Sequence, residues 1–153
     1  LAVLDFICKK ENIDVTEMVN ILNKKSGLLG LSRGLSSDFR DLNEAREQGN
    51  EDAKRAVDCL CYRIVKYIGS YVAAMNGVDA IAFTGGIGEN AIPVREAVVK
   101  SLGYLGITLD EEANQTRGEN KIISTPDSKV TVAIVPTNEE LAICQETAEL
   151  VSK

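Results

Sequence analysis

The sequence of 153 residues contains no histidine. Histidine is the side chain that most often transfers protons near neutral pH. Any chemistry in this chain must therefore use carboxylates, lysine, arginine, hydroxyl groups, backbone dipoles or a metal ion.

Excess positive charge is also missing, because 17 Lys and Arg residues face 23 Asp and Glu residues and leave a net charge of −6. A nucleic-acid surface needs the opposite sign, so we exclude nucleic acid as a partner. The sequence has no apolar run near the ~18 residues of a membrane span and no signal peptide at its start. We therefore expect no membrane partner and a cytoplasmic location. The chain starts at Leu1 within an amphipathic pattern, which indicates a piece of a larger protein.

The sequence contains no Cys-x-x-Cys pair. Its four cysteines, Cys8, Cys59, Cys61 and Cys144, have no neighbouring histidine, which gives a zinc or redox site little support. We expect buried free thiols in a reducing cytoplasm.

Apolar residues recur at helical spacing through most of the first half of the chain. The pattern predicts a helix over 1–10 and a second helix that opens at the capping box Asp14-x-x-Glu17 and turns Met18, Val19, Ile21 and Leu22 inward. Residues 26–37 are small and glycine-rich and read as an ordered loop. A further helix is expected from Ser37 or Asp38 to about Gly49. A long core helix is then expected over 51–76.

After Asn76-Gly77 the pattern alternates between short apolar runs and helices. We expect buried strands at 78–83 and 130–135, an edge strand at 121–124, and helices at 91–102 and 139–152. This order predicts an α/β fold with parallel strands flanked by helices.

The stretch Phe83-Thr84-Gly85-Gly86-Ile87-Gly88-Glu89-Asn90 lies between a predicted strand and a predicted helix. Glycines at such a turn let backbone N–H groups face outward, where the helix dipole favours an anion. The stretch has no Lys-Ser/Thr pair, so it is not a P-loop. It predicts a phosphate site and hence nucleotide binding.

Two other interpretations of this stretch stay open on the residues alone. Gly86-x-Gly88-x-x-Ala91 is a permitted dinucleotide fingerprint, and Asp110 follows 24 residues after Gly86, close to the ~20 expected for a ribose-binding acid. That reading gives a dinucleotide-dependent oxidoreductase. Alternatively, the glycines serve geometry only and the chain is an interaction module.

A polar turn, Ser36-Ser37-Asp38-Phe39-Arg40-Asp41, enters the helix expected near residue 38. Arg40 lies in the first helical turn, where the dipole disfavours a cation. Either it holds an anion or a stacked ring, or it pairs locally with Asp41 or Glu44.

A second polar turn, Pro136-Thr137-Asn138-Glu139-Glu140, follows the strand expected at 130–135. Thr137-x-x-Glu140 reads as a capping box. Asn138 and Glu139 remain at the carboxyl end of a strand, where open α/β sheets bind ligands. A carboxylate near phosphates suits Mg²⁺.

Together these segments resemble the acetate/propionate kinase family. The resemblance covers the whole chain, in family order and spacing, and includes one further segment, Asn23-Lys24-Lys25-Ser26-Gly27-Leu28-Leu29-Gly30. It implies that residues 1–153 are the carboxyl-terminal, nucleotide-binding portion of an acetate kinase. The implied fold is part of a ribonuclease-H-like domain of the actin/sugar-kinase superfamily.

The resemblance also implies the partners and the roles of single residues. The family uses ATP and Mg²⁺ to convert acetate into acetyl phosphate, usually as a homodimer, and propionate is an alternative acceptor. Asp38, Phe39 and Arg40 would line the adenosine end of the nucleotide, and Gly85, Gly86, Ile87, Gly88, Glu89 and Asn90 would hold adenosine and phosphates. Glu139 would serve the magnesium. The family's catalytic residues and acetate pocket lie upstream, so we assign no catalytic residue here and expect the isolated chain to be inactive.

Overall fold

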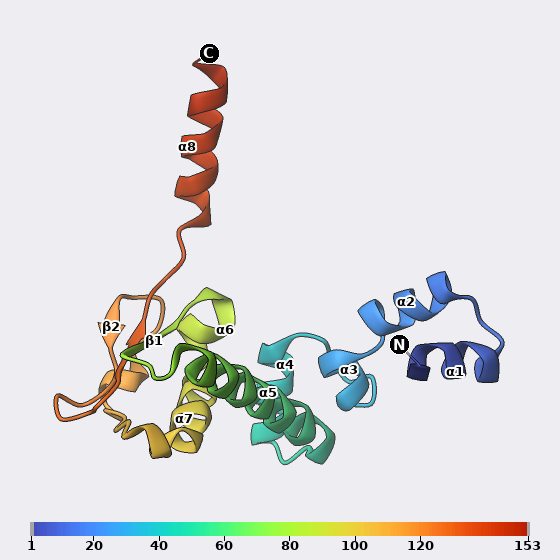
Figure 1. Cartoon of the computed structure of the whole chain (residues 1–153), viewed down its shortest axis with the longest axis horizontal. Coiled ribbons are helices and arrows are strands. Elements are labelled where there is room, and N and C mark those ends of the chain that lie inside the picture. Colours follow the sequence, from blue (N-terminus) through green and yellow to red (C-terminus); the bar gives the residue numbers. More distant parts are fainter. Residues whose placement is uncertain (1, 153) are drawn as a thin grey trace. The chain divides into compact units, whose positions relative to one another are not determined.

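The computed structural model describes residues 2–152, which form eight α-helices, two short 3₁₀ helices and three strands (Figure 1). The chain divides into two compact units, residues 1–63 and 64–153. The boundary falls inside the helix α5 (Glu51–Met75).

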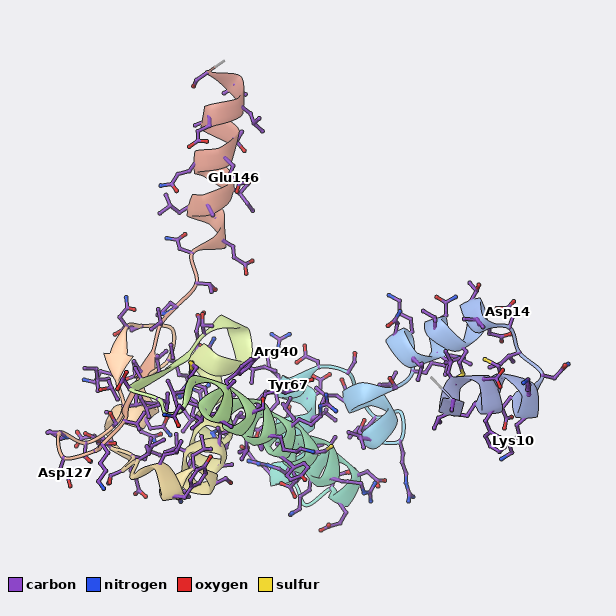
Figure 2. All side chains as sticks on the ribbon, in the orientation of Figure 1. Lys10, Asp14, Arg40, Tyr67, Asp127 and Glu146 are labelled. Atoms are coloured by element: carbon purple, nitrogen blue, oxygen red, sulfur yellow. The ribbon has the colours of Figure 1, made fainter. Side chains whose placement is uncertain are left out.

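The first unit is helical. Helix α1 (Ala2–Glu11) contacts α2 (Val15–Lys24), and the Asp14 side chain, labelled in Figure 2, accepts the N–H of Glu17 at 2.8 Å. The predicted cap is therefore confirmed. The predicted inward face is wrong in part: Met18 is buried, but Val19 and Leu22 are exposed.

The segment expected as a loop at 26–37 contains a short helix, α3 (Gly27–Leu31). The pattern does not predict this helix, because glycine has a low helix propensity. Helix α4 (Phe39–Glu47) starts where predicted, after Asp38. The core of this unit is made by fully buried side chains from α4 and from the first half of α5, namely Leu42, Ala53, Ala56 and Val57.

The second unit is built on a sheet of three strands in the order β1-β3-β2. Strand β1 (Ala80–Phe83) is parallel to β3 (Thr131–Ile134), and β2 (Lys121–Ile122) pairs antiparallel to β3. The parallel pairing and the edge position of β2 are as predicted. Strand β1 is less buried than expected, because Ala80 and Ala82 are exposed.

Helices α6 (Gly85–Asn90) and α7 (Ile92–Ser101) connect β1 to the 3₁₀ helices η1 (Gly103–Leu105) and η2 (Ala113–Gln115). The core of the unit is formed by side chains of α7, the sheet and the adjoining segments that are nearly or fully buried, namely Val94, Val98, Val99, Leu102, Ile123, Val132 and Ile134. Helix α8 (Glu139–Val151) closes the chain.

Helix α5 has the predicted length, but it is a core helix only in its first half. Tyr67, Tyr71 and Met75 carry the expected spacing and are nevertheless exposed. Within residues 2–152, no helix has the length and apolar character that crossing a membrane requires.

Candidate functional site

The carboxyl ends of β1 and β3 lie side by side. The parallel register pairs Phe83 with Ile134, and the N–H of Val135 donates to the Phe83 carbonyl at 2.9 Å. Both chain segments therefore leave the sheet at the same edge, one into α6 and the other into residues 136–138 and α8. This edge brings together two of the three segments that the sequence singled out.

The glycine segment is a short helix and not the open turn that the sequence predicted. Gly85 to Asn90 form α6, and a new helix, α7, begins at Ile92. The N–H groups of the first turn of a helix have no backbone acceptor within the helix, and in α6 the Gly85 N–H interacts with the Glu89 carboxylate. In the described part of the chain, the N-cap residue Thr84 makes no side-chain capping bond to them.

The three glycines of α6 differ in whether backbone conformation or close packing requires glycine at their position. Gly85 has φ +69°, a left-handed conformation that strains any residue with a Cβ. A Cβ on Gly88 would lie 3.1 Å from the Phe83 carbonyl carbon, a tight contact that would force the Phe83 backbone to shift by a few tenths of an ångström. A Cβ on Gly86 would meet nothing within 4 Å, and its φ is not positive. The fold alone gives no reason for glycine at position 86.

The other side chains of α6 point to different partners. The Asn90 amide donates back to the Gly86 carbonyl at 3.1 Å, and Ile87 is half-buried. The Glu89 carboxylate accepts the backbone N–H of Thr137 at 2.9 Å and its hydroxyl at 3.1 Å. The Thr137 backbone N–H is the largest cause that holds the pKa of Glu89 below its usual range, with smaller effects from the Thr137 hydroxyl and the Gly85 backbone.

The predicted capping box at Thr137 is wrong. Asn138 is the N-cap of α8, and its side-chain oxygen accepts the N–H of Leu141 at 3.0 Å. Thr137 is not free for this role because its donors are used by Glu89. Glu139 is the first residue of α8 and is exposed.

Arg95 on α7 was not identified from the sequence, although it is fully buried. Its guanidinium donates to five oxygens: Asn114 Oδ1 and the carbonyls of Gly88, Glu89, Asn114 and Thr116, at 2.6–2.9 Å. All its N–H donors are thus used, and burial lowers the pKa of the guanidinium. Its position among valines on the apolar face of α7 was the signal that could have revealed it.

Asp38, Phe39 and Arg40 belong to the first unit. Asp38 Oδ1 caps α4 by accepting the Arg40 N–H at 2.8 Å, and the Arg40 guanidinium (Figure 2) returns to the same carboxylate at 2.8 and 3.2 Å. This side-chain pairing, with the backbone bond second, lowers the pKa of Asp38 to about 2. The local partner of Arg40 is therefore Asp38, not Asp41 or Glu44. The Arg40 side chain is 88% exposed and Phe39 is half-buried.

Asp110 is occupied by its own loop. Its Oδ1 accepts the Ala113 N–H at 2.9 Å, at the start of η2, and its N–H donates to the Ile123 carbonyl. This structural role gives the dinucleotide interpretation no support.

Neither a cluster of metal-binding side chains nor a disulfide occurs within residues 2–152. Within residues 2–152, no group of three or more His, Cys, Asp or Glu side chains could hold a metal ion by itself. All four cysteines are free, and the expected burial holds for Cys8 and Cys61, whereas Cys59 is half-buried and Cys144 is exposed.

Comparison with known families matches residues 1–145 to the acetokinase family. The chain is 57% identical over 150 residues to the acetate kinase of Lachnoclostridium phytofermentans and 59% identical over 151 residues to that of Agathobacter rectalis. Each match covers 98% of this chain and 38% of the relative. The chain therefore spans about two fifths of the length of these relatives.

Solved structures agree with the sequence comparisons. The crystal structure of Porphyromonas gingivalis acetate kinase matches with a TM-score of 0.89 and 44% identity, over 98% of this chain and 38% of that chain. A propionate kinase from Francisella tularensis matches with a TM-score of 0.84 and 36% identity, over 95% and 36%. The predicted fold class is confirmed, since these proteins have the actin/sugar-kinase fold. The chain belongs to the acetokinase family.

Proposed function

We propose that residues 1–153 form the carboxyl-terminal, ATP- and Mg²⁺-binding portion of an acetate kinase. The whole enzyme would transfer the γ-phosphoryl group of ATP to a carboxylate oxygen of acetate and give acetyl phosphate and ADP. Catalysis of this transfer rests on positioning and on electrostatic stabilisation of the transferred group. Family membership supports the reaction class, and the residues at the sheet edge support the binding role.

The observation that carries the binding role is Gly86. Its two glycine neighbours are explained by the left-handed φ of Gly85 and the tight packing of Gly88, but Gly86 has neither constraint. Glycine at an open position, next to the first-turn amides of a helix, lets a ligand approach the backbone closely. We assign the backbone of Gly85, Gly86, Ile87, Gly88, Glu89 and Asn90 to the nucleotide on this ground.

Glu139 is the proposed magnesium residue. Mg²⁺ takes few protein carboxylates and completes its shell with water and phosphate oxygens, so a single exposed carboxylate fits it. The ion would neutralise charge on the phosphates when bound, while Glu139 would orient it from the first turn of α8.

Asp38, Phe39 and Arg40 are the proposed adenosine-side residues. Arg40 presents an exposed guanidinium that can stack on a base, and the Asp38 carboxylate holds it in one orientation. A homodimer in the cytoplasm completes the proposal, and the free cysteines agree with a reducing compartment.

Propionate is the second candidate acceptor, because a propionate kinase is among the structural matches. Steady-state rates with both acids would decide between them. The enzyme to test is a full-length chimera in which residues 1–153 replace the matching segment of the L. phytofermentans acetate kinase.

The binding role is tested by Gly86→Ala in the same chimera, with Mg-ATP binding measured by calorimetry. We expect the affinity to fall about tenfold or more while the unfolding midpoint stays unchanged or rises slightly, because a Cβ there would meet only the ligand. Gly103→Ala is the matched control, since it also meets nothing within 4 Å and its φ is not positive. Unchanged Mg-ATP affinity in Gly86→Ala would remove the glycine helix from the site. Acetyl phosphate formation by residues 1–153 alone would contradict the predicted inactivity of the isolated chain.

A further inference from the structure

The contact between Glu89 and Thr137 joins two segments that lie 48 residues apart in the sequence. One oxygen of the Glu89 carboxylate accepts both the backbone N–H and the hydroxyl of Thr137, at 2.9 and 3.1 Å. Charge-assisted hydrogen bonds of this kind are stronger than neutral ones. Helix α6, the glycine helix, is thus joined directly to the residue two positions before Glu139. We call these two hydrogen bonds the Glu89–Thr137 tie.

Thr137 lies in the middle of the short connection between β3 and α8. The connection is fixed at its start by the bond from Val135 N–H to the Phe83 carbonyl and at its end by the Asn138 cap on Leu141. Pro136 has no N–H to donate. Glu89 supplies the acceptor between these two ends, so it determines how the chain runs from the sheet into α8.

The main chain of Glu89 is itself held firmly. The buried Arg95 guanidinium donates to the carbonyls of Gly88 and Glu89, at 2.9 and 2.8 Å, and also binds the 114–116 segment. The carboxylate that reaches Thr137 therefore extends from a backbone that is fixed by hydrogen bonds. The tie can for this reason fix the position of Thr137 relative to α6.

Charge also bears on the role of Glu89. A carboxylate in direct contact with a polyphosphate is repelled, and the repulsion is larger near a protein surface than in bulk water. The same carboxylate is favourable when it accepts two donors from Thr137. The Thr137 N–H is the largest cause that lowers the pKa of Glu89, in agreement with this pairing.

We propose that Glu89 is a positioning residue: by holding Thr137, it sets the start of α8, and hence Glu139, relative to the glycine helix. The inference rests on the proposed function, because the tie has this role only if Glu139 holds Mg²⁺ beside the phosphates of the nucleotide. It assigns the Glu89 side chain a role that acts through Thr137 and leaves the nucleotide to the backbone of α6.

The first test asks whether the tie exists, and it needs no nucleotide. Amide hydrogen exchange of Thr137 is measured in the chimera with Glu89→Ala and with Glu96→Ala. Glu96 is the matched control, because it is also an acidic residue in a short helix of this unit, and its partner, Lys100, is one turn away. We expect faster exchange at Thr137 only in Glu89→Ala. Equal protection in all three proteins would overturn the proposal.

The second test asks whether the tie positions the magnesium residue. The Mg²⁺ concentration for half-maximal ATP binding is measured, together with ATP affinity without metal. We expect Glu89→Ala to raise the Mg²⁺ midpoint about 10- to 100-fold, as is typical for partners that orient metal ligands, and to change metal-free affinity less than twofold. Glu89→Gln, which keeps an acceptor oxygen, should restore part of the loss, and Glu96→Ala should change neither value.

The outcomes separate the two proposals. An unchanged Mg²⁺ midpoint in Glu89→Ala would overturn the positioning role. Equal losses with and without metal would overturn it as well, because they would make Glu89 a direct nucleotide ligand. If the unaltered chimera binds no Mg-ATP, the proposed function fails first, and the positioning role falls with it even where the exchange test shows the tie.

Discussion

Arg95 shows how a single buried charge can organise this unit. It is 0% exposed, and all its acceptors are neutral: one amide oxygen and four backbone carbonyls. These acceptors come from the end of α6 and from residues 114–116, and of the two α6 carbonyls, that of Glu89 also accepts the Gly118 N–H at 3.4 Å. An unpaired buried polar group costs about 1–3 kcal/mol, so a single guanidinium that supplies donors to several acceptors stabilises both segments at once.

Replacing Arg95 with Met keeps most of the volume but removes the guanidinium donors from five oxygens, of which the Glu89 carbonyl keeps the Gly118 N–H. We expect the free energy of unfolding to fall by about 3 kcal/mol or more, because the losses of several buried hydrogen bonds combine. Urea unfolding of the 153-residue chain, followed by circular dichroism, measures the change. Arg117→Met, at an exposed position, is the control: Arg117 only repels the Arg95 charge, so its loss should not lower the midpoint. Equal midpoints for the two variants would show that the Arg95 network does not stabilise the unit.

At the scale of elements, helix α6 depends on tertiary contacts more than on its own sequence. Three of its six residues are glycine, each of which costs a helix about 1 kcal/mol relative to alanine. What holds it is packing on β1 at Gly88, the Arg95 bonds to its last turn and the Glu89 tie to Thr137.

Gly88→Ala tests the packing of α6 on β1. The new Cβ would lie 3.1 Å from the carbonyl carbon and 3.4 Å from the Cα of Phe83, whose backbone is held in the sheet by Val135. We expect a loss of about 1–3 kcal/mol in the free energy of unfolding, as in other overpacked sites. Gly86→Ala, two residues away with open space around it, should leave stability unchanged or slightly raise it. If both alanines have the same effect on thermal unfolding, close packing does not explain Gly88.

These elements also show what the sequence could predict. Periodicity located α5, β3 and α8, because long or strongly apolar patterns depend little on distant residues. It does not predict α3 and α6, where tertiary packing overrides the low helix propensity of glycine.

The cap of α8 is a second case. The sequence predicts Thr137 as the cap where the structure has Asn138, because both residue types cap helices and only the bond to Glu89 decides between them. The sequence singled out the glycine motif and Glu139 as candidate site residues, and these remain predictions. Arg95 and the Glu89–Thr137 tie depend on contacts between residues far apart in the sequence.

At the scale of the whole molecule, the chain exposes much apolar surface for its size. Large hydrophobic side chains of the second unit are more than a third exposed on α5, η1 and α8, namely Tyr71, Met75, Tyr104, Leu141, Ile143, Leu150 and Val151. All thirteen residues of α8 are exposed. Strand β1 is an edge of the sheet, and within residues 2–152 no further strand pairs with it. Apolar patches and open edges of this kind are typical of surfaces that another protein segment covers.

We therefore expect the 153-residue chain alone to bind a hydrophobic dye such as ANS and to associate as its concentration rises. In the full-length chimera the added segment would cover these surfaces, so dye fluorescence per molecule should fall several-fold. Fluorescence titration and light scattering over a range of concentrations measure both effects. Leu150→Gln/Val151→Gln in the isolated chain is an internal control: it should reduce association without lowering the urea midpoint, since both side chains are exposed. A monodisperse chain without dye binding would contradict the expectation, because the exposed face would then have to be buried in some other way by the chain itself.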